Sequence, residues 1–361
     1  MAGKGKAAQG YIDAAVKHQI FLQRFVGTSN KQLLGFIRDI NASVQNLLEA
    51  ANDQTLTKAR YKKLLSAIRD LESEFAPTLK QKQKEQLKAL AAYEADFTAR
   101  LLDRSANIEK AEKAIDFESV APTTGQLRAA AGTDILNSRI GYGDTGQTVS
   151  EVLNDFTSKQ VGQAMKTVRQ GFATGQPVNQ MANDIAEALG SKVNRNQAQA
   201  IARTTVNHVA SQSRNTFYNE NKDILSHYKV IAILDGRTTI TCQALDGKIF
   251  PIDEFSPPPY HWNCRTTFIG IPKTSYIDLP AGDRAAKGSD GVEHVAANTD
   301  YGSWIKRQDT QFKVEVLGTK RAKLLDAGMP IEKFVDERYK PITLDELRTK
   351  DNEHIFKKAG L

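Results

Sequence analysis

The chain has 361 residues, of which 40% are hydrophobic and 25% are charged. This length allows two or three domains of ordinary size, and this balance excludes a globally disordered chain. No apolar run reaches the roughly 18–20 residues needed to span a bilayer, and the start of the chain lacks the apolar core of a signal peptide. We therefore expect a product that is cytoplasmic when made and has no membrane span.

The net charge of +7 is unevenly distributed along the chain. Residues 1–113 carry 19 basic and 13 acidic side chains, whereas the two signs nearly balance in the remainder. A basic helical segment suits contact with nucleic acid. A solvated helical surface explains the same excess, and we favour that interpretation because no DNA-binding motif accompanies it.

The first predicted domain, residues 1–116, is a helical hairpin or bundle. Helix-forming residues dominate it, and proline is expected to break the helix at Pro77. Such a long helical stripe offers an extended apolar surface, so this region is the expected docking arm for a partner. Apolar side chains recur at three- and four-residue steps in two stripes: Leu64, Leu65, Ile68, Leu71 and Phe75, then Leu87, Leu90, Ala91, Glu94, Phe97 and Leu101.

Residues 117–147 are rich in glycine and are predicted to form a linker or irregular arm. A core domain is expected over 148–275. Thr148 and Glu151 have the spacing of a capping box, and Pro177 stands at the entry of a later helix. A long helix over 198–218 carries a polar face that is either solvated or docked onto the following sheet. That face comprises Arg203, Asn207, Ser211 and Asn215.

Short strands are predicted at 227–234, 248–252 and 266–271, where β-branched and aromatic residues lie between turn signals. Residues 276–298 are rich in Gly, Asp and Ala and are predicted to be a second linker. The predicted fold class is therefore α+β and helix-rich, with strands confined to about 226–271. Residues 299–361 are expected to form a C-terminal helical segment, with helices over 301–308, 319–326 and 343–348.

One group of residues in the core domain has the chemistry of a metal site. Cys242, His261 and Cys264 supply two thiolates and one imidazole, which are ligands that zinc prefers. His261 and Cys264 are three positions apart, close enough in a tight turn to share one ion. Asp235 is the first candidate for a fourth ligand, ahead of His227 and His208.

Other interpretations of the two cysteines stay open. They can pack as a metal-free cluster held by hydrogen bonds, or form a disulfide, which a reducing cytosol disfavours. A Cys/His nucleophilic pair and a zinc-dependent hydrolase are further alternatives, and Glu254 is the carboxylate nearest in the downstream sequence that could act as base. Phosphate-binding loops and the common hydrolase motifs are absent.

The same residues resemble the phage Mu F-like head-morphogenesis proteins. That family pairs a helix bearing Arg-Thr and Asn with a strand ending in Asp-x-Arg-Thr, followed by Cys, Asp-Gly and Pro-x-x-His-x-x-Cys-Arg. These elements stand here as Arg203-Thr204, Asn207, Asp235-Gly-Arg-Thr238, Cys242, Asp246-Gly247, Pro258 and His261-Trp-Asn-Cys-Arg265. Relatives often have a third cysteine where this chain has Thr266, so one metal ligand is missing. Tail segments extend the resemblance to about residues 148–350.

The resemblance implies a minor head structural protein of a tailed bacteriophage and implies no catalysis. Such a protein is associated with the portal and acts in procapsid assembly, DNA packaging or DNA delivery. Its implied partners are the portal protein, the major capsid or scaffolding protein, and packaged DNA. Its implied location is the inside of the virion head, after assembly in the host cytoplasm. An internal virion protein ejected with the genome is the alternative function.

Overall fold

The computed structural model of the protein describes residues 11–50, 55–113, 120, 122–123, 127, 139–140, 146–273, 282–349 and 352–361. The chain divides into two compact units. Unit 1 comprises residues 1–21, 94–123 and 211–361, and unit 2 comprises residues 22–93 and 124–210. In the described ranges, no helix combines the length and the apolar character needed to cross a membrane. The linear domain boundaries expected from the sequence remain predictions.

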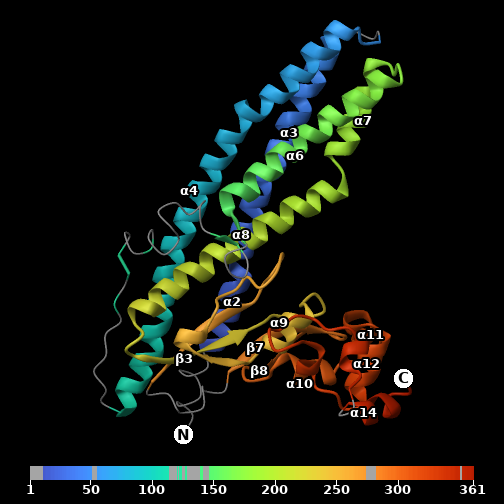
Figure 1. Cartoon of the computed structure of the whole chain (residues 1–361). Helices are drawn as coiled ribbons and strands as arrows, with labels where there is room; N and C mark the ends of the chain where they lie inside the picture. Colours follow the sequence, from blue (N-terminus) through green and yellow to red (C-terminus); the bar gives the residue numbers. More distant parts are fainter. Residues whose placement is uncertain are drawn as a thin grey trace. The chain divides into compact units, whose positions relative to one another are not determined.

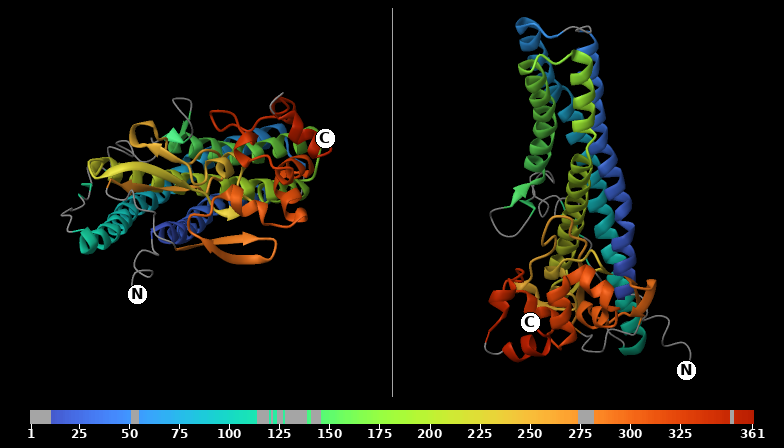
Figure 2. Two further views of the ribbon diagram at one scale, coloured as in Figure 1. Left: turned by 90° about the horizontal axis from the view of Figure 1, so that it is seen from below. Right: turned by 90° about the vertical axis from the view of Figure 1, so that its right-hand side faces the viewer.

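Unit 2 is a bundle of long helices whose members run side by side (Figures 1 and 2). Helix α3 packs against α6 and α7, and α6 packs against α7. The bundle consists of α3 (Gln23–Glu49), the first part of α4 (Lys58–Lys113), α6 (Val149–Ala173), α7 (Val178–Leu189) and the start of α8 (Lys192–Glu220). The predicted helical character of residues 1–116 is confirmed for the described part of this range, although its helices share their bundle with α6, α7 and α8.

The first apolar stripe predicted for this region, and the start of the second, contribute to the core of unit 2, whereas Phe97 and Leu101 at the end of the second pack in unit 1. Leu64, Ile68 and Leu71 of α4 are buried in one cluster with residues of α3, α6 and α7. Burial of these side chains removes apolar surface from water, which stabilises the bundle by roughly 1.5–3 kcal/mol for each large side chain. The stripe is therefore occupied within the chain and is not the free docking surface that the sequence suggested.

The predicted helix break at Pro77 is wrong, because α4 continues through it from Lys58 to Lys113. Proline removes one backbone hydrogen bond, to the carbonyl four residues earlier, here that of Ser73. Ser73 and Pro77 both lie on the exposed face of the helix, where water can satisfy that carbonyl. On the opposite face, Leu71 and Leu79 before and after the proline are buried in the same core, and their packing outweighs the lost bond.

Local signals at the ends of α6 and α7 are confirmed. The Thr148 hydroxyl accepts a hydrogen bond from the Glu151 amide at 3.0 Å, and the Glu151 carboxylate accepts one from the Thr148 amide at 2.7 Å. This capping box satisfies amide groups that the first turn of α6 leaves unpaired. Pro177 is the residue that precedes α7.

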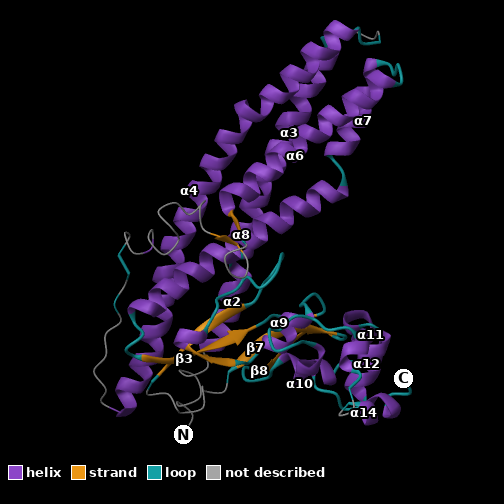
Figure 3. Ribbon diagram, viewed as in Figure 1, coloured by secondary structure: helices purple, strands orange, loops and turns teal. Residues whose placement is uncertain are grey.

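Unit 1 contains two small three-stranded sheets, which Figure 3 shows beside short helices. The first has the order β5-β3-β6 and is antiparallel. In the second, of order β4-β7-β8, β4 pairs parallel with β7, and β7 pairs antiparallel with β8. The strands are β3 (Leu225–Ile231), β4 (Leu234–Asp235), β5 (Ile249–Pro251), β6 (Thr267–Pro272), β7 (Asp283–Gly288) and β8 (Gly291–Ala296). A third, two-stranded pair, β1 (Arg139–Ile140) with β2 (Gln147–Thr148), lies in the residues assigned to unit 2.

Strands β7 and β8 correct the expectation of a linker over 276–298, of which residues 276–281 lie outside the described range. The sequence of β7, Asp-Arg-Ala-Ala-Lys-Gly, lacks the β-branched residues that identify strands. Pairing with β4 and the burial of Ala286 and Arg284 hold it in the sheet instead. Gly291 begins β8 with a φ of +99°, which a glycine adopts without strain.

Helix α2 and the C-terminal helices complete unit 1. Helix α2 (Tyr11–Phe21) packs against β6 and β7, and the Tyr11 hydroxyl donates a 2.9 Å hydrogen bond to the Gly270 carbonyl. Trp304 and Phe334 are fully buried in the C-terminal core. The C-terminal elements are α10 (Tyr301–Lys306), α11 (Thr310–Leu317), α12 (Thr319–Asp326), η5 (Ile331–Phe334), α13 (Leu344–Leu347) and α14 (Glu353–Lys358). The α+β, helix-rich fold class is confirmed, whereas confinement of strands to 226–271 is not.

Candidate metal centre

One short helix and one tight turn bring both cysteines of the chain together with one histidine. Helix α9 (Ile240–Leu245) carries Cys242, and His261 and Cys264 lie in the tight turn before β6. The turn is closed by a 3.2 Å hydrogen bond from the Cys264 amide to the His261 carbonyl. Asn263 has a φ of +64°, a conformation that asparagine tolerates better than most residues. The tight turn thus brings the side chains of His261 and Cys264 close together.

The three side chains are in contact. The Sγ atoms of Cys242 and Cys264 are 3.8 Å apart, and His261 Nε2 lies 3.1 Å from Cys242 Sγ. His261 Nδ1 lies 2.7 Å from the Trp262 carbonyl, which can only accept, so Nδ1 carries a proton. In the neutral ring, Nε2 therefore turns its lone pair toward the sulfur atoms and the Thr239 hydroxyl.

The surroundings of the two thiols shift their pKa values in opposite directions. Burial and the neighbouring Cys264 sulfur raise the pKa of Cys242 well above its usual value. Burial also opposes a thiolate at Cys264, but hydrogen bonds from Cys242 and His261 and the charge of the imidazole lower the pKa of Cys264 well below its usual value. Burial disfavours the charged form of His261 too, yet its contacts with Cys264 and the Trp262 carbonyl raise the pKa of the imidazole. The pair of Cys264 and His261 therefore favours a thiolate beside an imidazolium.

The two sulfur atoms have the separation that two ligands of one tetrahedral zinc ion have. Zinc–sulfur bonds of about 2.3 Å at tetrahedral angles place two sulfur ligands about 3.8 Å apart. The Sγ atoms of Cys242 and Cys264 are not joined in a disulfide and are 3.8 Å apart. All three donor atoms lie within 4.8 Å of one another. The hydrogen bond from His261 to a backbone carbonyl is also the contact that usually orients a zinc-bound imidazole.

The structure brings together three of the four predicted ligands. Among the described residues, Cys242, His261 and Cys264 form the group that can share one ion, and neither Asp235, His227 nor His208 belongs to it. His208 lies on α8 in unit 2, where burial lowers the pKa of its imidazole to about 4. A zinc ion at this centre would therefore have three protein ligands.

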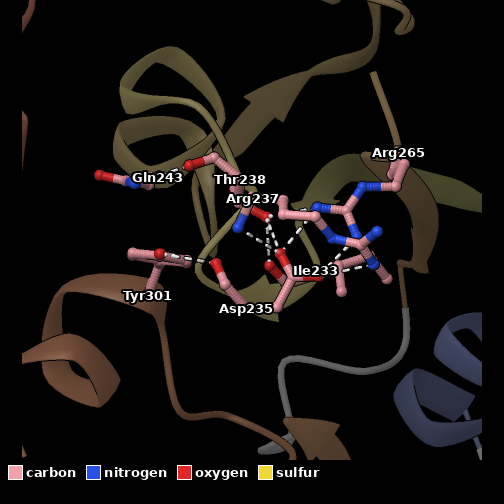
Figure 4. A network of polar contacts seen from close by, with 7 residues as sticks. All are labelled: Ile233, Asp235, Arg237, Thr238, Gln243, Arg265 and Tyr301. Atoms are coloured by element: carbon pink, nitrogen blue, oxygen red, sulfur yellow. Dashed lines mark hydrogen bonds and ion pairs between the residues drawn. The ribbon is translucent and has the colours of Figure 1, made fainter. Parts of the chain in front are cut away.

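Asp235 instead accepts two hydrogen bonds from the guanidinium of Arg265, at 2.6 and 2.7 Å (Figure 4). Its Oδ1 also accepts the amide of Arg237, and the Tyr301 hydroxyl donates to its backbone carbonyl at 2.8 Å. Burial opposes the charged carboxylate, but the hydrogen bonds and charge of Arg265 lower the pKa of Asp235 below its usual value. The fork of Arg265 matches both carboxylate oxygens, so this pair fixes the loop that follows β4.

A second pair connects the loop after α9 to β7. Arg284 lies 3.1 Å from the Asp246 carboxylate, and both side chains are buried. Asp246 also accepts the Ala232 amide at 2.7 Å, while Arg284 donates to the Ala232 carbonyl. Burial raises the pKa of Asp246 despite the opposing charge of Arg284. The Asp-Gly of the family pattern is thus anchored to a strand that sequence reasoning assigned to a linker.

Sequence reasoning also missed a buried ionic cluster in unit 1. Glu94 on α4 accepts a hydrogen bond from Arg214 and contacts His18 Nε2 at 2.5 Å. Arg214 donates further to Thr267 and to the Phe268 carbonyl, so α8 is bonded to β6. One signal was present, because Glu94 stood as the single charged residue in an otherwise apolar stripe.

The predicted polar face of α8 is partly buried and lies toward β6. Asn207 and Ser211 are buried, so this face is not simply solvated, and Arg214 makes the bonds to Thr267 and Phe268. Arg214 lies three residues beyond Ser211, a spacing that places both on the same side of the helix. Glu254, the base considered for a hydrolase, is exposed on a 3₁₀ turn and lies outside the Cys–His group.

Comparison with known families supports the resemblance. Residues 163–269 match the family model described as Phage Mu protein F like protein. The match contains Asp235, Cys242, His261, Cys264 and Arg265, and the tail beyond Ile269 lies outside it. No curated protein and no solved structure matches the chain. The chain therefore carries a Mu F-like segment, narrower than the span of 148–350 expected from the sequence.

Proposed function

We propose that this protein is a minor head protein of a tailed bacteriophage, associated with the portal and acting in procapsid assembly, DNA packaging or DNA delivery. The observation that carries the proposal is the Mu F-like match over residues 163–269. Its motif residues fold into two adjoining polar sites, the Cys–His group and the Asp235–Arg265 pair. Both hold loops in place and neither includes a carboxylate aimed at the sulfur atoms, which supports a structural and not an enzymatic role.

The portal is the first partner to test, with major capsid or scaffolding protein and packaged DNA as further partners. Co-expression of the full chain with the portal protein of the same phage is expected to give a complex that survives size-exclusion chromatography. The full chain is required, because residues 22–93 supply much of the core of unit 2 and a fragment from residue 148 would lack them. Separate elution at micromolar concentrations would argue against direct portal association.

The basic excess of residues 1–113 favours a second candidate, an internal virion protein ejected with the genome. Quantitative mass spectrometry of full particles and of particles emptied of DNA separates the two. A head-structural protein is retained after ejection at the same ratio to major capsid protein. An ejected protein is lost with the DNA.

The Cys–His group is proposed to bind zinc through Cys242, His261 and Cys264. Bound zinc supplies a cross-link that pins loop 235–247 to loop 257–265. Cys264 is placed to donate as a thiolate and His261 through Nε2, because Nδ1 is engaged by the Trp262 carbonyl. Asp235, the fourth ligand expected from the sequence, is held by Arg265 and is left out of this proposal.

Elemental analysis of the purified protein tests this proposal, with about one zinc per chain expected. A chelator should then lower the melting temperature, since metal binding and folding are coupled. Cys264→Ser and His261→Ala should each cost more than the ~1 kcal/mol of a typical substitution. Less than about 0.2 zinc per chain, together with no effect of chelator, would leave packing and hydrogen bonds as the explanation.

A further inference from the structure

A groove of about 850 Å³ lies on unit 2 between α6, α7 and the start of α8. Lys159, Gly162 and Lys166 form its α6 wall, at steps that place them on one face of the helix. Asp184 and Glu187 form its α7 wall, and Val193 closes one end. These six residues are called the α6–α7 groove below.

The floor of the groove is held by hydrogen bonds between its three elements. Asn194 is buried, and its side-chain amide donates to Gln163 Oε1 and to the Ala188 carbonyl, each at 3.0 Å. Gln163 in turn donates to the Ala188 carbonyl at 3.2 Å. A groove fixed in this way is already formed before anything binds it, which reduces the entropy lost on association.

The two walls carry opposite and equal charge. Lys159 and Lys166 stand on one side, and Asp184 and Glu187 on the other. Among the described residues, none of these four takes part in an ion pair, and Asp184 accepts a hydrogen bond from the neutral Gln176 amide. The four charges are therefore available to a binding partner.

Two apolar features of the groove also point to a partner. The Val193 side chain is 70% exposed, so its burial by a partner would be favourable. A Cβ built on Gly162 would meet no atom within 4 Å, so the helix backbone is open to close approach there. Glycine within a helix costs about 1 kcal/mol relative to alanine, and nothing inside unit 2 requires it at this position.

We propose that the α6–α7 groove is a self-association surface, in which two copies of this chain pair around a two-fold axis so that α6 of each copy faces α7 of the other. A groove of one charge fits a ligand of the opposite charge, whereas a groove with equal numbers of both signs is complementary to itself. Two-fold symmetry places Lys159 and Lys166 of each copy opposite the acidic wall of the other, so each attraction occurs twice. This proposal does not depend on portal association.

Sedimentation velocity on the full chain tests for the pair. At low ionic strength, raising the concentration should shift the protein from the mass of one chain to twice that mass. Raising salt to 1 M should weaken the dimer, because it shortens the screening length to about 3 Å. A single chain at every concentration up to several hundred micromolar would overturn the proposal.

Charge reversal identifies the surface. The basic wall is reversed in the variant Lys159→Glu with Lys166→Glu, and the acidic wall in the variant Asp184→Lys with Glu187→Lys. Each variant alone should dimerise at least about tenfold more weakly, because like charges then face each other. An equimolar mixture of the two should form a heterodimer, because the reversed acidic wall of one copy again meets an opposite charge on the other.

The matched control is Lys82→Glu, which reverses an exposed charge on α4 outside the groove and should leave the dimer unchanged. Circular dichroism of every variant checks that the helices are retained. Dimers that persist in both double variants, or a mixture that stays monomeric, would overturn the assignment of the groove. Gly162→Leu provides a second test, since a bulky side chain on the α6 wall should obstruct the close approach of the other copy and weaken the dimer without altering charge.

Discussion

Unit 2 and unit 1 bury very different kinds of side chain. The helices of unit 2 enclose an extended apolar cluster, and its buried contact between Ser29 and Gln83 is uncharged. Unit 1 encloses Glu94 with Arg214, and Asp246 with Arg284, all almost fully buried. Apolar packing depends mainly on the area removed from water, whereas a buried ion pair depends on the continued presence of both partners.

The difference has a structural cause in each unit. Long amphipathic helices present continuous apolar stripes, which bury one another without the help of buried polar or charged contacts. Unit 1 joins short strands and loops that are far apart in the sequence, and these leave backbone groups to be satisfied. The guanidinium of Arg284 bonds to the Ala232 carbonyl, and that of Arg214 to the Phe268 carbonyl. We infer that the charged groups of unit 1 specify how its small elements pair.

The largest predicted effect comes from removing one member of a buried pair. Glu94→Ala should lower the free energy of unfolding by about 3–5 kcal/mol, since Arg214 would remain buried without its carboxylate. Replacing both residues, Glu94→Leu with Arg214→Met, should cost much less than the single change. Urea denaturation measures both. A double variant as unstable as the single one would show that the charge pair is not the source of the loss.

Acid should weaken unit 1 through Asp235. Its pKa is lowered in the folded protein, so its contribution is complete above the unfolded value of about 3.9 and is lost as pH falls through the folded pKa. Asp235→Asn should therefore cost about 1.5–3 kcal/mol at pH 7, as expected for hydrogen bonds to a charged group. The difference in unfolding free energy between the variant and the parent protein should disappear as the pH falls below about 4. A difference that stays constant from pH 7 to pH 3 would contradict this account.

A stabilising change is expected in unit 2 at Pro77. Pro77→Ala restores the amide that can bond to the Ser73 carbonyl. The helix penalty of about 3 kcal/mol is offset by up to about 1 kcal/mol from the more restricted unfolded chain, so the net gain is roughly 2 kcal/mol. Thr78→Ala, at the exposed neighbouring position, should change stability by less than about 0.7 kcal/mol. Loss of stability in the Pro77 variant would show that the core of unit 2 needs the proline.

Features that depend on residues close together in the sequence could be predicted, whereas features that depend on residues far apart in the sequence could not. The capping box at Thr148 was predicted, because its two residues are only three positions apart. Strand β7 was missed, since its stabilising contact is between Arg284 and Asp246, 38 positions earlier. Pro77 was misjudged for the same reason, because the packing on either side of it involves helices far away in the sequence.

The candidate site shows the same division. Cys242, His261 and Cys264 were found because they are rare residue types at a short spacing, and the structure does bring them together. Asp235 was placed in the wrong environment, because no pattern in the sequence showed that Arg265 would hold both of its oxygens. The sequence alone does not distinguish an aspartate that binds a metal from an aspartate that pairs with an arginine, because the two differ only in their neighbours in the folded protein.

The smallest predicted effect compares one capping box in each unit. Thr148→Ala should lower the unfolding free energy by about 1 kcal/mol, because the cap opens α6, a 25-residue helix packed into the core of unit 2. Thr343→Ala removes the same kind of bond from α13, which has four residues. There the loss should appear as faster hydrogen exchange at the Glu346 amide, with little change in global stability, since a short surface helix can open locally. Equal losses of global stability in the two variants would contradict this contrast, and Thr→Ser at each position should retain most of the cap.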